Sequence, residues 1–285
     1  TSEIVAQTVA TANVALGEDA FQRIIKEKHD ANIMFLIQQA NVRSSELKTA
    51  KAFQEEVKAI GEAANKQITN IEISAYASPD GALDLNQGLA EKRQDATAKV
   101  VNKNLKKDKM EANVDTKYTA EDWEGFQELV SKSNIQDKEL ILRVLSMYKE
   151  PEQREQEIKN ISSVYSALAD EILPQLRRSR LTLNYEIIGK SDEEIANLAD
   201  TNAKELSLEE LLYAATLAKD AAKKEAIYTK ATQLFPNDYR AFNNLGKLAY
   251  EAGDMDKAEN LLKKALTIKE NPEANMNLGL VELAK

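Results

Sequence analysis

The side chains best suited to binding a small charged ligand lie between residues 78 and 93. Ser78-Pro-Asp-Gly81 combines a hydroxyl and a carboxylate with strong turn-forming residues. A helix is predicted to follow, and on a helical wheel Arg93 lies about 40° from an apolar stripe that includes Leu85 and Leu89. A covered guanidinium in such a place needs an anion or hydrogen-bond acceptors. Alternatively, its stem packs while its charged end reaches water or pairs with an acid of the same domain.

Asn86 is the second polar candidate on this helix. An asparagine near a helix start more often bonds the backbone of the preceding turn than a ligand. Asp84, with Gln87 three residues on, predicts a capping box that starts the helix.

The elements that position these residues are predicted from hydrophobic periodicity. A continuous apolar run is typical of a strand covered on both faces. A run in which apolar and polar residues alternate is typical of a half-buried strand. Helical patterns between about 119 and 174 indicate an insertion before the closing strand, with Trp123 and Phe126 anchoring a small core. The strands are expected at 32–37, 71–77, 110–118 and 181–187. With helices between them, they predict a small sheet covered by helices, in an α+β fold.

The chain is predicted to have three parts. Residues 1–30 have no clear role, although Ile4 to Val9 could be an edge strand of a preceding domain. Residues 31–189 form the α+β domain with its insertion, and residues 190–285 are all helical. Because the chain starts at Thr1 without a signal-like segment, we expect any targeting signal to have been removed.

The segment from Ile73 to Arg93 resembles the signature of OmpA-like peptidoglycan-binding domains. These domains have a strand, an acidic turn with glycine, and a helix that opens Asn-x-x-Leu-Ser-x-x-Arg. Here Asn86, Leu89 and Arg93 match, while Ala90 replaces the usual serine. The Ser-Pro-Asp-Gly turn and the segment 122–126 are similar to versions found in Bacteroidota, and Arg177-Arg-Ser-Arg180 is similar to the start of the family's closing strand.

The resemblance implies a βαβαβ sandwich that binds peptidoglycan. In the family, the arginine at the position of Arg93 binds the carboxylate of diaminopimelate, and an aspartate on the preceding loop binds its ammonium group. In this chain the aspartate position falls on Ser78, and the only acid in the turn is Asp80. The ligand residues implied are therefore Arg93, Asp80, Ser78 and Asn86.

Residues 196–285 resemble tetratricopeptide repeats. Small residues such as Gly246, Ala258 and Ala265 allow paired helices to approach closely. Asn275-Met-Asn-Leu-Gly279 repeats the motif Asn243-Asn-Leu-Gly246, and Ser207 with Glu210 predicts a capping box for an earlier unit. The chain stops inside the first helix of the third unit, Pro272 to Lys285. We therefore expect the repeats to bind a protein partner at their concave surface or at the exposed end.

Composition excludes several classes of function. The net charge of -9 disfavours nucleic acid as a partner, which needs a basic surface. No cysteine is present, so disulfides and thiolate chemistry are excluded. No stretch is long and apolar enough for a membrane span. His29 is the sole histidine, and without cysteines or a second histidine it cannot form a recognisable zinc or nucleophile site. We therefore expect neither a cofactor nor catalysis.

Together these features predict a non-enzymatic protein of the periplasm or cell envelope, associated with the outer membrane. Its OmpA-like domain would bind peptidoglycan, and its repeats a protein partner. Since Ser78 stands where the family has an acid, the alternative is an interaction scaffold whose OmpA-like domain has lost peptidoglycan binding.

Overall fold

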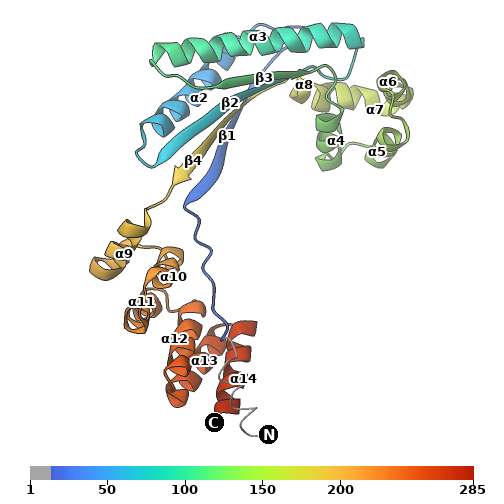
Figure 1. Cartoon of the computed structure of the whole chain (residues 1–285). Helices are drawn as coiled ribbons and strands as arrows, with labels where there is room; N and C mark the ends of the chain where they lie inside the picture. The colour runs from blue at the N-terminus through green and yellow to red at the C-terminus, as the bar shows by residue number, and fades with distance from the viewer. Residues whose placement is uncertain (1–13) are drawn as a thin grey trace. The chain divides into compact units, whose positions relative to one another are not determined.

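The computed structural model describes residues 14–285, except for the side chains of 162–164, and it has an α+β fold. One compact unit spans Ile24–Ile188, and the other joins Gly189–Lys285 to the residues before Ile24. The first unit contains a mixed four-stranded sheet with interleaved helices, and the second contains a run of packed helices (Figure 1). The predicted edge strand between Ile4 and Val9 lies outside the described residues.

The sheet has the strand order β1-β4-β2-β3. The closing strand therefore lies between the first two strands, antiparallel to both, while β2 and β3 run parallel. The four strands are β1 (Ile24–Met34), β2 (Lys66–Tyr76), β3 (Val114–Thr119) and β4 (Arg178–Ile188).

A strand overlaps each of the four predicted ones, and all four have shifted boundaries. β2 and β4 contain the predicted alternation, so that Ile73 pairs with Leu181 on the core face. β1 begins at Ile24, well before the predicted run at 32–37, because its exposed polar residues pair along β4 without contributing an apolar pattern. His29 lies within β1, where its ring stacks on Phe53, rather than before the strand.

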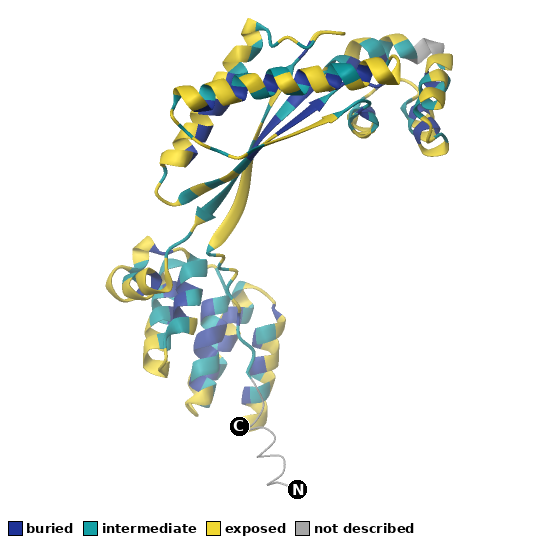
Figure 2. Cartoon of the chain, turned by 45° about the horizontal axis from the view of Figure 1, so that its top comes forward, coloured by how far each residue is buried: buried dark blue, intermediate teal, exposed yellow. Residues whose placement is uncertain are grey.

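Two helices cover one face of the sheet, α2 (Ser44–Glu62) and α3 (Leu83–Lys107). Figure 2 shows buried residues on the side of α3 toward the sheet and exposed residues on its outer side. The predicted stripe on α3 is wrong: Leu85 is 75% exposed, whereas Arg93 is fully buried. The predicted capping box is also absent, since Ala82 is the N-cap and no side chain caps the helix.

The inserted helices form a small core of their own, as the sequence predicted. Phe126 is buried, and Trp123 packs against the same cluster. Asp122 caps the first of these helices by accepting a hydrogen bond from the backbone N–H of Gly125. The elements are α4 (Trp123–Lys132), α5 (Lys138–Met147), α6 (Pro151–Asn160), α7 (Ser162–Ala167), a π-helical turn (Leu168–Ile172) and α8 (Leu173–Leu176).

The second unit consists of helices packed in sequence order. The predicted capping box of Ser207 and Glu210 is present. Gly246 lies against Leu262 with no room for a side chain, which explains the close helix approach. In the described part of the chain, no helix is long and apolar enough to cross a membrane. The helices are α9 (Asp192–Thr201), α10 (Leu208–Leu217), α11 (Ala221–Leu234), α12 (Arg240–Glu251), α13 (Met255–Ile268) and α14 (Pro272–Ala284).

Candidate functional site

All four predicted site residues line one cavity of about 610 Å³. It lies between the turn after β2, the first turns of α3 and the segment after β1. Ser78 and Asp80 come from the turn, and Asn86 and Arg93 from α3. The cavity also contains Arg177, which precedes β4 and which the sequence analysis did not include in the site.

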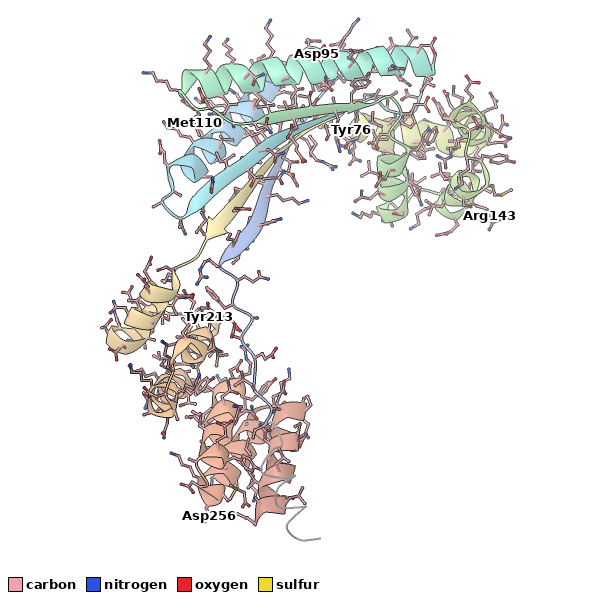
Figure 3. All side chains as sticks on the ribbon, viewed as in Figure 1. Tyr76, Asp95, Met110, Arg143, Tyr213 and Asp256 are labelled. Carbon is pink, nitrogen blue, oxygen red and sulfur yellow. The ribbon has the colours of Figure 1, made fainter. Side chains whose placement is uncertain are left out.

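Arg93 forms a fully buried part of this site. Its guanidinium donates three hydrogen bonds to backbone oxygens, from Nε to Gln39 (2.9 Å), from Nη1 to Tyr76 (2.9 Å) and from Nη2 to Leu36 (3.1 Å). Tyr76, labelled in Figure 3, is the last residue of β2. The guanidinium also lies over the ring of Phe35, 5.2 Å from its centroid. Arg93 therefore holds the ends of β1 and β2 against α3.

The charge of Arg93 is not neutralised by direct contact with an acid. Within the described residues, no carboxylate forms an ion pair with it. Burial, followed by the nearby charge of Arg177, lowers the pKa of Arg93 to about 10, whereas the carboxylate of Asp80 acts in the opposite direction. Arg93 therefore remains a cation at neutral pH, and the two arginines create a positive potential in the cavity.

Asp80 is the more enclosed of the two acids that line the cavity, the other being Asp84. Its Oδ1 accepts a hydrogen bond from the hydroxyl of Ser78, and its Oδ2 lies 3.9 Å from Nη2 of Arg177. The side chain of Asp80 is 23% exposed, so an incoming group can still reach it. Ser78 stands at the position where the resemblance implies an aspartate. It is 6% exposed, and its hydroxyl orients Asp80.

The turn that carries Asp80 is fixed by the conformation of Gly81 and by one further hydrogen bond. Gly81 has a φ of 98°, a conformation that favours glycine. Asn86 donates a hydrogen bond from Nδ2 to the backbone oxygen of Asp80 (3.1 Å). This contact matches the structural role that is common for asparagine at a helix start. Asn86 thus shapes the turn from within the cavity wall.

The inserted helices also hold this turn, which sequence reasoning missed. Glu155 on α6 accepts a hydrogen bond from the backbone N–H of Gly81 (3.1 Å) and forms an ion pair with Lys159. Pro79 and Asp80 line a small pocket together with Trp123. No local pattern identifies Glu155, because its partner is a backbone group in a distant turn.

Apolar side chains lie at the edge of the cavity. Ile37 is 55% exposed and Leu85 is 75% exposed, and both line it. Exposed large apolar residues beside buried charged groups are typical of a binding site for a mixed ligand. A ligand with both charged and aliphatic parts fits this lining best.

The chemistry of the site is that of charge recognition. The cations Lys92, Arg93 and Arg177 and the acids Asp80 and Asp84 line one cavity. Such a set of charges can bind a molecule that has both a carboxylate and an ammonium group. Throughout residues 14–285, no group of three or more histidine, cysteine or acidic side chains is arranged to hold a metal ion. No protein-family model matches this chain, and no curated protein matches its sequence.

Proposed function

We propose that residues 24–188 form an OmpA-like domain that binds the stem peptide of peptidoglycan in the cavity beside Arg93. The sequence of Asn86, Leu89 and Arg93 supports this proposal, because it is similar to the helix motif of that family. The arrangement of a strand, a turn with glycine and a helix around one cavity also supports it. The observation that carries the proposal is the shared cavity of Arg93, Asp80 and Arg177.

The proposed ligand is the zwitterionic end of a diaminopimelate side chain. Arg93 is fully buried and three of its five N–H groups bind backbone oxygens, so it would act on a carboxylate in the cavity through its charge. Arg177 supplies a second cation for the same carboxylate, and Asp80 takes the ammonium group. The aliphatic chain of the ligand would contact Ile37 and Leu85.

The whole chain is then a non-enzymatic protein of the periplasm, attached to the cell wall and associated with the outer membrane. Its helical unit, which is similar in sequence pattern to tetratricopeptide repeats, would bind a protein partner. Closely packed helix pairs with small residues at their contacts, as at Gly246, support this part of the proposal.

Retention on purified sacculi tests wall binding, and Gly88 offers a matched pair of variants. Gly88 lines the cavity, and a Cβ at this position meets no atom within 4 Å. Gly88→Glu would place a carboxylate in the cavity to compete with the ligand, while Gly88→Gln adds the same bulk without the charge. We expect Gly88→Glu to lower retention at least about tenfold relative to Gly88→Gln, because it neutralises the arginines.

Gly88→Ala is the folding control, since it adds one methyl group to a helix and leaves most of the cavity open. It should be retained like the wild type. Equal retention of the wild type and Gly88→Glu would show that the cavity does not bind the wall.

A scaffold without wall binding is the second candidate, and the bonding of Arg93 favours it. Its three bonds to backbone oxygens give this residue a structural role that requires no ligand. In this case, sacculi would retain neither the wild type nor the Gly88 variants, whereas crosslinking in cells would still capture a protein partner. A monomeric wild-type protein that yields no crosslink would exclude the scaffold.

A further inference from the structure

A row of buried amide side chains lies on the first helices of successive helix pairs in the second unit. Asn243 and Asn244 on α12 and Asn277 on α14 are each at most 1% exposed. Nδ2 of Asn277 donates a hydrogen bond to Oδ1 of Asn243 (3.0 Å), which links the two helices. Buried amides need further partners, because an unsatisfied polar group in such a place is strongly unfavourable.

Those partners are backbone groups of the segment that precedes β1. Ala15 donates its N–H to Oδ1 of Asn277 (2.7 Å), and its backbone oxygen accepts hydrogen bonds from Nδ2 of Asn277 (2.7 Å) and of Asn243 (3.1 Å). Both backbone groups of Ala15 are therefore bound by amide side chains that lie more than 200 residues away in the chain.

The same pattern recurs two residues further along. Gly17 donates its N–H to Oδ1 of Asn244 (2.7 Å), and Nδ2 of Asn244 donates to the backbone oxygen of Gly17 (3.0 Å). At Ala20, the N–H is bound by a carboxylate oxygen of Glu209 on α10 (2.6 Å). The segment thus passes across α14, α12 and α10 in turn, as the ribbon in Figure 1 also shows.

Through these contacts, side chains of the helices bind the main chain of an extended peptide. Alternate residues point the same way in an extended chain, which matches the spacing of Ala15 and Gly17. The three residues from Gly17 to Ala20 span about 10 Å when extended. This is close to the distance of about 8–10 Å between packed helices, so the segment reaches from α12 at Gly17 to α10 at Ala20. The groove lined by Asn277, Asn244 and Glu209 therefore has the repeat of an extended segment.

The groove also limits the size of the residue that can occupy the position of Gly17. A Cβ at Gly17 would lie 3.0 Å from Cβ and 3.1 Å from Cα of Arg240, closer than ordinary contacts allow. Arg240 cannot easily withdraw, because it forms ion pairs with Glu209 and Asp238 and donates to the backbone oxygen of Glu18 (3.2 Å). Glycine fits at this position, whereas a larger residue would have to displace Arg240.

We propose that this groove is a peptide-binding site for an extended segment with glycine at its centre, and that residues 15–20 are its tethered occupant. A segment of the same kind from a partner protein binds only after the occupant leaves. This inference rests on the partner-binding part of the proposed function and is independent of the cavity beside Arg93. A tethered ligand acts at an effective concentration of the order of millimolar, so it strongly weakens binding of an untethered one.

The test uses the full chain and a fluorescent peptide with the sequence of residues 14–23. Gly17→Val in the protein should expel the tethered segment while every groove residue is kept. We expect the peptide to bind the Gly17→Val protein at least about tenfold more tightly than the wild type, because the competitor is weakened. Equal binding to both proteins, or to neither, would overturn the proposal.

Two controls separate recognition from unspecific binding. The same peptide with valine in place of glycine should bind the Gly17→Val protein at least about tenfold more weakly. Adding Asn244→Ala to that protein should also weaken binding of the unaltered peptide, because both of its hydrogen bonds to glycine are lost. If neither change weakens binding, the groove is not the site.

Hydrogen exchange of the wild-type chain provides a measurement that does not depend on a variant. If the occupant can leave, the amides of Ala15 and Gly17 exchange much faster than those in the middle of α12, because the segment opens without unfolding the helices. Exchange of both sets at the same slow rate would overturn the proposal. Retention on sacculi does not involve this groove, so a failure here is distinguishable from a failure of wall binding.

Discussion

Arg178 and Asp122 form a buried ion pair that joins the closing strand to the inserted helices. Nη1 of Arg178 lies 2.7 Å from Oδ2 of Asp122, and the two side chains are only 10% and 5% exposed. The other carboxylate oxygen of Asp122 accepts the N–H of Gly125 (2.9 Å), and the guanidinium lies 4.2 Å from the ring centroid of Tyr76. One carboxylate thus caps α4 and binds a cation at the first residue of β4.

Removal of this carboxylate should strongly destabilise the sheet unit. We expect Asp122→Ala to lower the free energy of unfolding by about 3–5 kcal/mol, since it leaves Arg178 buried without its counter-ion. Asp122→Asn should have a smaller effect, because its side-chain oxygen can still accept from Gly125. Urea denaturation at neutral pH measures both.

The double variant Asp122→Leu/Arg178→Met is the control for the pair itself. Without either charge, it should be more stable than Asp122→Ala alone. If the double variant loses as much stability as Asp122→Leu and Arg178→Met lose separately, added together, the two residues act independently.

Local periodicity was sufficient for β2, β4 and the main helices, but not for the partners of buried polar groups. Ile71, Ile73 and Leu183 follow the alternation that places them in the core. The helical wheel predicts Arg93 at the edge of an apolar stripe, yet Arg93 lies at the centre of the buried face of α3. This orientation is possible because the guanidinium donates to three backbone oxygens, one at the end of β2 and two in the segment after β1. No sequence pattern shows those oxygens.

Arg93 should therefore be a stability determinant whether or not it binds a ligand. Arg93→Met removes the arginine donors of three backbone oxygens, of which that of Leu36 still accepts the N–H of Gln39 (3.1 Å). At about 1 kcal/mol or more for each of the other two oxygens, we expect a loss of at least about 2 kcal/mol. Lys103→Met makes a similar exchange on the exposed side of the same helix and should change stability by less than about 0.5 kcal/mol. Denaturant midpoints compare the two. Equal midpoints would contradict the role of the carbonyl contacts.

The sequence also showed the Asn-Leu-Gly motif at 244–246 and 277–279, but not what the asparagines bind. Their ligand is a main chain, and a main chain leaves no side-chain signature in the segment that supplies it. Residues 14–23 form neither a helix nor a strand, so periodicity offers no prediction for them. Only the packing of α12 and α14 brings the amides into one row.

The two glycines of this motif should respond oppositely to alanine. A Cβ at Gly246 would lie 2.8 Å from Leu262, so Gly246→Ala should destabilise the helical unit by about 1–3 kcal/mol through overpacking. At Gly279 a Cβ meets nothing within 4 Å, so Gly279→Ala should stabilise it by up to about 1 kcal/mol through helix propensity. Thermal unfolding of both variants measures the difference. A stabilising Gly246→Ala would contradict the close approach of α12 and α13.

The contact of Ala20 with Glu209 should weaken in acid. Burial alone would raise the pKa of Glu209, but hydrogen bonds from Arg240 and from the N–H of Ala20 outweigh it, and the pKa is lowered. A carboxyl group with a lowered pKa stabilises the folded state fully above its unfolded pKa, about 4.5, and the stabilisation is lost as the pH falls through the folded value. Glu209→Gln should therefore reduce the melting temperature at about pH 7 and have little effect at about pH 3.

Glu193→Gln is the matched control, since Glu193 is an exposed acid on α9 of the same unit. Its effect on the melting temperature should be small at both pH values. Hydrogen exchange across the same pH range locates the change: the amide of Ala20 should lose protection in acid before the amides of α12 do, because its acceptor becomes protonated. If Glu209→Gln lowers the melting temperature equally at both pH values, the charge of Glu209 does not hold the segment.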